Sequence, residues 1–220
     1  MTGFIPADDE ERRGLRHYLT RLLALDARAS VRLQGSGLVL GVWGGPPLDV
    51  VTLRPVALAA AVAPLDATVS ATRLLERFDV ADEGAPPPAA VEVPASVPGP
   101  TWAGLLPPRS GWQALATVPA GAVYDAVRVG IDAFARRVEL VPVDDRSRGR
   151  LDAAAAEVWH RPVVAGVPLR AAHAADLVGL LGREGDVTAY ASGPWLRLSC
   201  PGGSVALRSG SSGPLDLFSL

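Results

Sequence analysis

The sequence predicts an α+β protein with two pseudo-equivalent halves, each a helix packed on an antiparallel β-meander. Two observations support this fold class. Each half contains a helical pattern followed by apolar runs that glycine-rich turns separate, as expected of antiparallel strands. A proline-rich stretch without periodicity, residues 84–110, lies between the halves and predicts a linker or long loop.

The N-terminal half, residues 1–83, begins with a predicted helix. Acidic residues from Asp8 to Glu11 precede an apolar stripe that starts at Leu15, and carboxylates favour the positive end of a helix. Extended runs follow at 31–34, 38–43 and 50–54, separated by Gly35-Ser36-Gly37 and by a Gly-Gly-Pro-Pro sequence. We expect these runs to form a three-stranded meander. A further strand at 67–71 then leads into a short helix at 72–78.

The C-terminal half, residues 111–208, shows the same alternation of patterns. Its predicted helices are 121–137, 151–157 and 169–181, and Gly182 supplies a C-terminal stop for the last one. Extended runs are predicted at 112–118, 138–143, 158–164, 187–191, 195–199 and 204–208. Residues 209–220 form a Ser/Gly-rich tail that carries an apolar peptide.

An internal repeat supports the two-half organisation. The segment from Val31 to Gly37 aligns with the segment from Val187 to Gly193, and both continue into an apolar strand and a Gly-Gly pair. The alignment predicts that Gly35-Ser36-Gly37 and Ser192-Gly193 are equivalent turns between two strands.

The charge balance argues against a general nucleic-acid or anionic-membrane surface. The chain has 21 basic and 23 acidic residues, all of the basic ones arginine, and a formal net charge of −2. The single cysteine cannot form an intramolecular disulfide. The N-terminus lacks the pattern of a signal peptide, and the uncharged run at 55–65 is too short to span a membrane. We therefore expect a cytoplasmic protein.

Two residues are candidates for catalysis. Arg170, His173 and Asp176 follow one another at helical spacing, so Asp176 could orient His173 as a general base. The alternative is a polar stripe along the edge of an alanine-rich helix. Cys200 stands at the end of a strand without a local base, which favours a small apolar role over a nucleophilic one. No His/Cys cluster has the spacing of a metal site, so we expect neither a metal nor a cofactor.

The C-terminal tail carries the strongest functional signal. Leu215-Asp216-Leu217-Phe218 resembles the core of the peptide motif by which bacterial polymerases and repair proteins bind the sliding clamp. In that motif a Gln leads, and here Pro214 stands in its place. The resemblance implies that Leu215, Asp216, Leu217 and Phe218 bind a protein partner. The globular part, including Gly166 to Ala175, is similar to a family of high-GC bacteria that suggests no mechanism.

The leading hypothesis is a non-catalytic interaction or scaffold protein, an accessory of DNA replication or repair that binds the sliding clamp through its tail. Two alternatives are a small-ligand-binding domain and an enzyme that uses His173 or Cys200 in a pocket between the halves. We expect a protein partner, no direct contact with nucleic acid and no membrane association. The sequence leaves formation of a homo-oligomer open.

Overall fold

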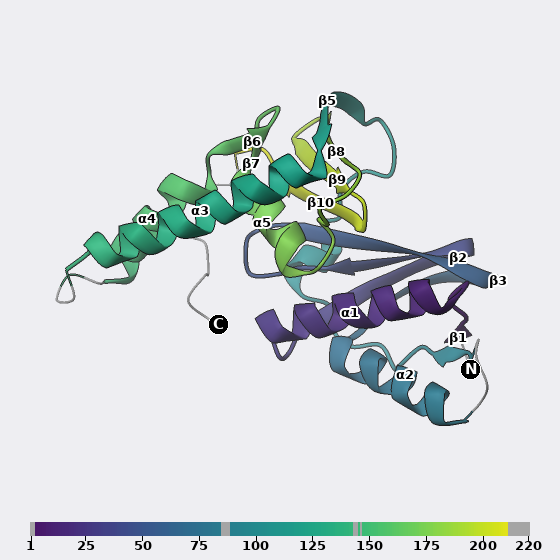
Figure 1. The fold of residues 1–220 in the computed structure, drawn as a ribbon. Helices are drawn as coiled ribbons and strands as arrows, with labels where there is room; N and C mark the ends of the chain where they lie inside the picture. Colours follow the sequence, from purple (N-terminus) through teal and green to yellow (C-terminus); the bar gives the residue numbers. More distant parts are fainter. Residues whose placement is uncertain (1–2, 85–88, 143–144, 146, 211–220) are drawn as a thin grey trace. The chain divides into compact units, whose positions relative to one another are not determined.

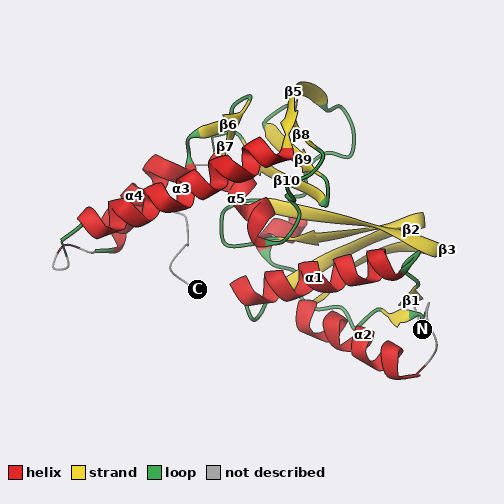
Figure 2. Ribbon diagram, viewed as in Figure 1, coloured by secondary structure: helices red, strands yellow, loops and turns green. Residues whose placement is uncertain are grey.

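The computed structural model describes residues 3–84, 89–142, 145 and 147–210 (Figure 1). The chain divides into two compact units. Unit 1 comprises residues 1–46, 51–106 and 177–179, and unit 2 comprises residues 47–50, 107–176 and 180–220. Both units combine helices and antiparallel strands, which confirms the predicted α+β class with two halves (Figure 2). None of the helices in the described residues is long and apolar enough to span a membrane.

Unit 1 is built on a long hairpin. Strands β2 (Ser30–Gly44) and β3 (Val51–Ser70) pair antiparallel along most of their length. Helices α1 (Asp9–Leu25) and α2 (Ala71–Gly84) pack against each other and against this hairpin (Figure 1). Strands β1 (Gly3–Phe4) and β4 (Val91–Glu92) form a second small sheet, and the 3-10 helix η1 spans Thr101–Gly104.

The sequence explains where α1 begins. The Asp8 carboxylate accepts a hydrogen bond from the backbone N–H of Glu11 at 2.8 Å, and three acidic residues occupy the first turn. The predicted apolar stripe is buried at Leu15, Leu19 and Leu22. The predicted N-terminal helix is therefore confirmed, with its end at Leu25.

The predicted three-stranded meander of the N-terminal half is wrong in one respect. Gly35-Ser36-Gly37 does not turn the chain but lies inside β2, where the pairing shifts register opposite Leu65 and Val62. Opposite Gly37, β3 has more residues than β2, so the pairing contains a bulge. Gly37 has a φ of 62°, a conformation that glycine adopts easily, and β2 continues past it. By contrast, Gly193 separates two strands, so the aligned segments of the proposed repeat differ here.

Unit 2 contains four antiparallel strands that are hydrogen-bonded in the order β10-β9-β8-β5. These strands are β5 (Gln113–Pro119), β8 (Asp186–Ser192), β9 (Trp195–Cys200) and β10 (Gly203–Arg208). The predicted C-terminal meander is confirmed as β8, β9 and β10. Three helices complete the unit, α3 (Ala120–Leu140), α4 (Arg148–Trp159) and α5 (Leu169–Leu177), together with the hairpin of β6 (Pro162–Val164) and β7 (Val167–Pro168).

Tertiary packing overrides two local predictions in unit 2. The strand predicted at 138–143 is wrong, because α3 continues to Leu140. Phe134 lies 6.1 Å from Trp159 between ring centroids, and Arg137 forms an ion pair with Glu157 at 3.0 Å. These contacts with α4 stabilise the extra helical turn against the β propensity of the valines. The extended run predicted at 158–164 is likewise shorter, since α4 includes Val158 and Trp159.

A buried chain of hydrogen bonds fixes α1 on the hairpin of unit 1. Tyr18 and Thr52 have their hydroxyl oxygens 2.7 Å apart, and Thr52 donates to the carbonyl of Gly44 at 3.1 Å. Tyr18 is 1% exposed and Thr52 is fully buried, and burial raises the pKa of Tyr18. Because Thr52 donates to Gly44, Tyr18 must donate to Thr52. Thr52 therefore satisfies two buried polar groups at once.

We expect Thr52→Val to lower the free energy of unfolding by about 1–3 kcal/mol, because it leaves the Tyr18 hydroxyl buried without an acceptor. Thr20→Ala on the exposed face of α1 is the matched control and should change stability by less than about 0.5 kcal/mol. Urea denaturation of both variants measures the difference. Equal stability of the two variants would show that the hydrogen-bond chain contributes nothing.

Candidate functional site

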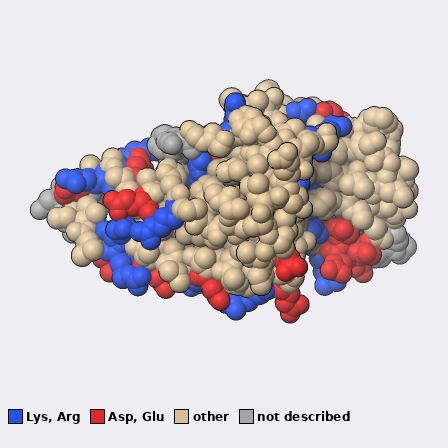
Figure 3. Space-filling view, turned by 90° about the horizontal axis from the view of Figure 1, so that it is seen from above, with Lys and Arg blue, Asp and Glu red and all other residues tan. Residues whose placement is uncertain are grey.

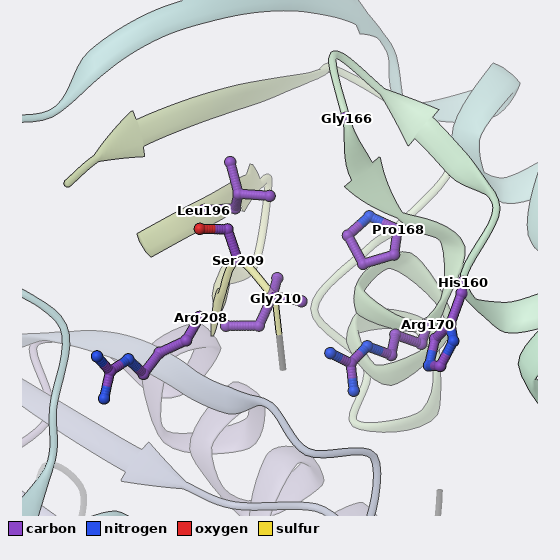
Figure 4. A pocket seen from close by; sticks show the side chains of 9 residues that line it. His160, Gly166, Pro168, Arg170, Leu196, Arg208, Ser209 and Gly210 are labelled. Carbon is purple, nitrogen blue, oxygen red and sulfur yellow. The ribbon is translucent and has the colours of Figure 1, made fainter. Parts of the chain in front are cut away.

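A pocket of about 240 Å³ in unit 2 brings together two arginines and a histidine. Figure 4 shows His160 and Arg170 on one side of the pocket and Arg208 on the other. The side chains come from the end of α4, the start of α5 and the end of β10. The lining residues are His160, Gly166, Pro168, Arg170, Leu196, Leu207, Arg208, Ser209 and Gly210.

Arg170 is the most deeply buried polar residue of this pocket, with 1% of its surface exposed. Its Nη1 atom donates to the carbonyl of Leu48 and to Oδ2 of Asp49, each at 3.2 Å. Asp49 has a φ of 53°, a left-handed conformation that aspartate tolerates better than most residues. A buried guanidinium needs such partners because desolvation of an unpaired charge is costly. The ion pair therefore fixes Arg170 as part of the pocket wall.

The turn between β6 and β7 shapes the rim. Val164 pairs with Val167, so Ala165 and Gly166 form a two-residue hairpin loop. Their φ values are 44° and 83°, and two positive φ angles are the signature of a type I′ turn. Gly166 meets this demand without strain and brings backbone, not a side chain, to the pocket.

The surroundings of His160 disfavour its charged form. Burial lowers the pKa of His160, the positive charge of Arg170 lowers it further, and Asp49 opposes these two effects. Its Nε2 atom is buried and has no hydrogen-bond partner. The imidazole thus offers an unsatisfied polar atom at the edge of the pocket.

The chemistry of the lining favours binding of an anion over proton transfer. Arg208 is exposed, and the hydroxyl of Ser209 is already committed to the carbonyl of Pro194 at 3.1 Å. The nine lining residues include no carboxylate and no thiol that could act with His160 as an acid–base pair. Sequence reasoning did not single out His160, Arg208 or Asp49, because no local motif connects these three positions.

His173 is not the solvated general base that helical spacing allowed. It is 9% exposed and stacks on Trp159, with 4.3 Å between ring centroids and 8° between the planes. Its Nδ1 atom is buried without a hydrogen-bond partner, so Asp176 does not orient it through that nitrogen. Burial lowers the pKa of His173 to about 4. Of the predicted polar stripe, which could be solvated or hydrogen-bonded, Arg170 is buried and hydrogen-bonded, whereas His173 is buried against Trp159.

Cys200 is 8% exposed at the end of β9. Burial raises the pKa of its thiol to about 12, and its Sγ lies 4.0 Å from the carbonyl oxygen of Leu198. A thiol protonated at neutral pH is a poor nucleophile. The environment of Cys200 therefore favours a packing role, as its position in the sequence suggested.

The remaining predicted site residues, Leu215, Asp216, Leu217 and Phe218, lie outside the described residues. The chain reaches them from Arg208, the last residue of β10. Within the described part of the chain, no three His, Cys, Asp or Glu side chains gather into a group that could hold a metal ion.

Two family models match the chain, one for each half. Residues 1–104 match a family described as a domain of unknown function (DUF8010). Residues 107–212 match a second domain of unknown function (DUF8185). A comparison with curated proteins gave no match.

The solved structures give a clearer likeness. The fold is similar to that of a DNA polymerase sliding clamp. The clamp of Pseudomonas aeruginosa crystallised with a ligand matches 97% of this chain with a TM-score of 0.54 and 15% identity. The pol III beta of Caulobacter crescentus matches 98% with a TM-score of 0.52 and 14% identity. The chain covers 66% of the first clamp's length, just under two thirds. At these identities the likeness concerns the clamp-like fold alone.

We expect His173 to make the clamp-like fold sensitive to acid. In the unfolded chain the imidazole has its ordinary pKa near 6.5, and in the folded chain about 4. Between pH 4 and pH 6.5 the unfolded state therefore binds more protons than the folded state. The contribution of neutral His173 to the free energy of unfolding is complete above pH 6.5 and falls as the pH drops towards 4. The loss is on the order of 3 kcal/mol at pH 4.

His173→Phe keeps a ring against Trp159 but removes this titration, so its stability should depend less on pH than that of the parent. Urea denaturation at pH 7, 5.5 and 4.5 compares the two proteins. Parallel pH profiles would show that His173 contributes nothing to acid sensitivity.

Proposed function

We propose that this chain is a non-catalytic, clamp-like scaffold of bacterial DNA replication or repair that binds a sliding clamp through its C-terminal peptide. The observation that carries the proposal is the likeness to sliding clamps over 97% of the chain. A fold shared with clamps supports work in the same machinery, although the fold by itself does not define the partner.

The interior of unit 2 supports a non-catalytic role. His173 and Cys200, the two residues with the clearest catalytic potential in the sequence, are buried. Their pKa shifts favour the neutral imidazole and the protonated thiol. A catalytic nucleophile or base needs access to substrate and a pKa suited to its task. Both side chains instead serve the packing of unit 2.

The sequence of the tail favours binding to a protein partner. The five residues from Ser209 to Gly213 separate β10 from Leu215, so the apolar peptide is tethered by a spacer typical of flexible linkers. Short peptides of this kind place a few apolar anchors into a pocket of the partner. In the motif that the tail resembles, Leu217 and Phe218 are the hydrophobic anchors, and Asp216 stands between the two leucines.

The direct test uses the sliding clamp of Pseudomonas aeruginosa and the full chain. We expect weak, measurable binding that is lost when residues 209–220 are removed and when Leu217→Ala is combined with Phe218→Ala. Pro214→Gln should tighten binding, because it restores the amide that leads the motif. Isothermal titration measures all four proteins.

Ser211→Ala combined with Ser212→Ala is the matched control, since it alters the spacer and spares the anchors. It should bind like the parent. The melting temperature of the double anchor variant should stay within about 1 °C of the parent, as for other surface changes. Unfolding of that variant, or unchanged clamp binding, would refute the tail as a binding element.

The pocket of Figure 4 supports a second candidate function, binding of a small anionic ligand. Arg208 is exposed, Arg170 is fixed in the wall, and the buried Nε2 atom of His160 lacks a partner. Phosphate and carboxylate groups are the natural complements of arginine side chains. Leu196 and Leu207 would contact the apolar part of such a ligand.

We expect inorganic phosphate to raise the melting temperature of the parent at low ionic strength. Arg208→Gln should weaken this binding roughly tenfold, because it removes one charge-assisted contact. Arg28→Gln, an exposed arginine of unit 1, is the control for general charge effects. An equal response of all three proteins to phosphate would exclude a specific site in the pocket.

A further inference from the structure

A second concave surface of unit 2 is apolar and has no role in the functions proposed above. It is a groove of about 320 Å³ between α3 and the segment that joins α4 to β6. Ala126, Val129 and Ala133 of α3 form one side, and Pro162 and Val163 lie on the other. Val129 is 64% exposed, far more than expected for a valine that packs within its own unit.

The groove has one charged residue at its edge. Arg161 lines it directly after α4, and its Nε atom donates to the carbonyl of Glu157 at 2.9 Å. This bond holds the guanidinium beside the apolar surface. An occupant that combines apolar side chains with one acidic group would therefore match the groove in both chemistry and charge.

The described chain ends at the pocket of Figure 4, which shares the hairpin of β6 and β7 with this groove. Ser209 and Gly210 line the pocket of Figure 4 together with His160 and Pro168. The next residues in sequence, Arg161 and Leu169, line the apolar groove. The hairpin of β6 and β7 thus contributes to both concave surfaces. Five peptide links separate Gly210 from Leu215 and can span at most about 17 Å, which is the reach of the tail from this pocket.

The residues after Gly210 have the composition that the groove requires. Leu215 and Leu217 stand two positions apart, so in an extended segment both side chains point to the same side. Phe218 adds a larger apolar group, and Asp216 supplies the single acidic one. We propose that residues 214–218 dock in cis in the groove formed by α3 and β6, with Asp216 facing Arg161.

This docking would regulate the proposed function, because the same residues cannot contact a sliding clamp and the groove at once. Its regulatory consequence rests on clamp binding, but the docking itself does not. The groove would then lower the apparent affinity of the full chain for a partner by the fraction of time that the peptide is bound to it.

The test uses cysteine pairs in the full chain with the native thiol removed by Cys200→Ala. Val129→Cys combined with Leu217→Cys should form an intramolecular disulfide at a rate independent of protein concentration, since a short tether gives a millimolar effective concentration. The matched control replaces Val129→Cys by Leu140→Cys, an 82% exposed position about 16 Å further along α3. We expect cross-linking at position 129 to be at least about tenfold faster than at position 140.

Equal rates for the two pairs would overturn the proposal, and so would disulfides that form only between two chains, since these indicate docking onto a second copy. Val129→Asp provides an independent measurement. It should increase hydrogen exchange at Ala126–Ala133 to the level of a chain that ends at Gly210. A cross-link at position 129, together with no clamp binding by the Val129→Asp variant, whose tail keeps its anchors and is released from the groove, would leave the docking intact and refute only the proposed function.

Discussion

The buried charge of Arg170 is the constraint around which unit 2 is arranged. A guanidinium that is 1% exposed has lost almost all of its hydration, so the fold must supply partners for it. The carbonyl of Leu48 and the carboxylate of Asp49 do so, and Asp49 adopts a left-handed backbone conformation to reach it. Once Arg170 is fixed, the start of α5 is fixed, and with it one wall of the cationic pocket. The lowered pKa of His160 follows in part from the same charge.

The two concave surfaces of unit 2 differ because their walls come from different elements. The pocket with Arg170 and Arg208 is walled by the ends of helices and strands and by a type I′ turn, which together present backbone and charged side chains. The groove beside α3 is walled by a helix face rich in alanine, where short side chains leave an apolar hollow. Gly130 shows how closely α3 packs there, since a Cβ at that position would lie 2.6 Å from Leu169 Cδ2. Charges of both signs occur in small groups over the face seen in Figure 3.

Local patterns in the sequence were sufficient to predict those elements that depend on local interactions. Asp8 and the leucine stripe predicted α1, and Gly193 and Gly202 marked the turns of the C-terminal meander. Long-range packing decided the rest. The sequence pattern of Gly35 to Gly37 is the same for a turn and for a bulge, and only the unbroken β3 opposite makes it a bulge. Arg170 and Asp49 are 121 positions apart, so no spacing rule could have placed them together.

The order of strands in the sheet of unit 2 also has a consequence for how the chain folds. β8, β9 and β10 are joined by short turns, so each of these pairings closes only a small loop. β5 instead pairs with β8 across the whole helical part of the unit, and Thr117 and Thr188, whose hydroxyls lie 2.9 Å apart, are separated by 71 positions. Closing that loop costs more chain entropy than either hairpin. Unit 2 thus combines two rapidly closing contacts with one slow contact, and its folding rate is governed by how α3, α4 and α5 bring β5 to the edge of an existing meander.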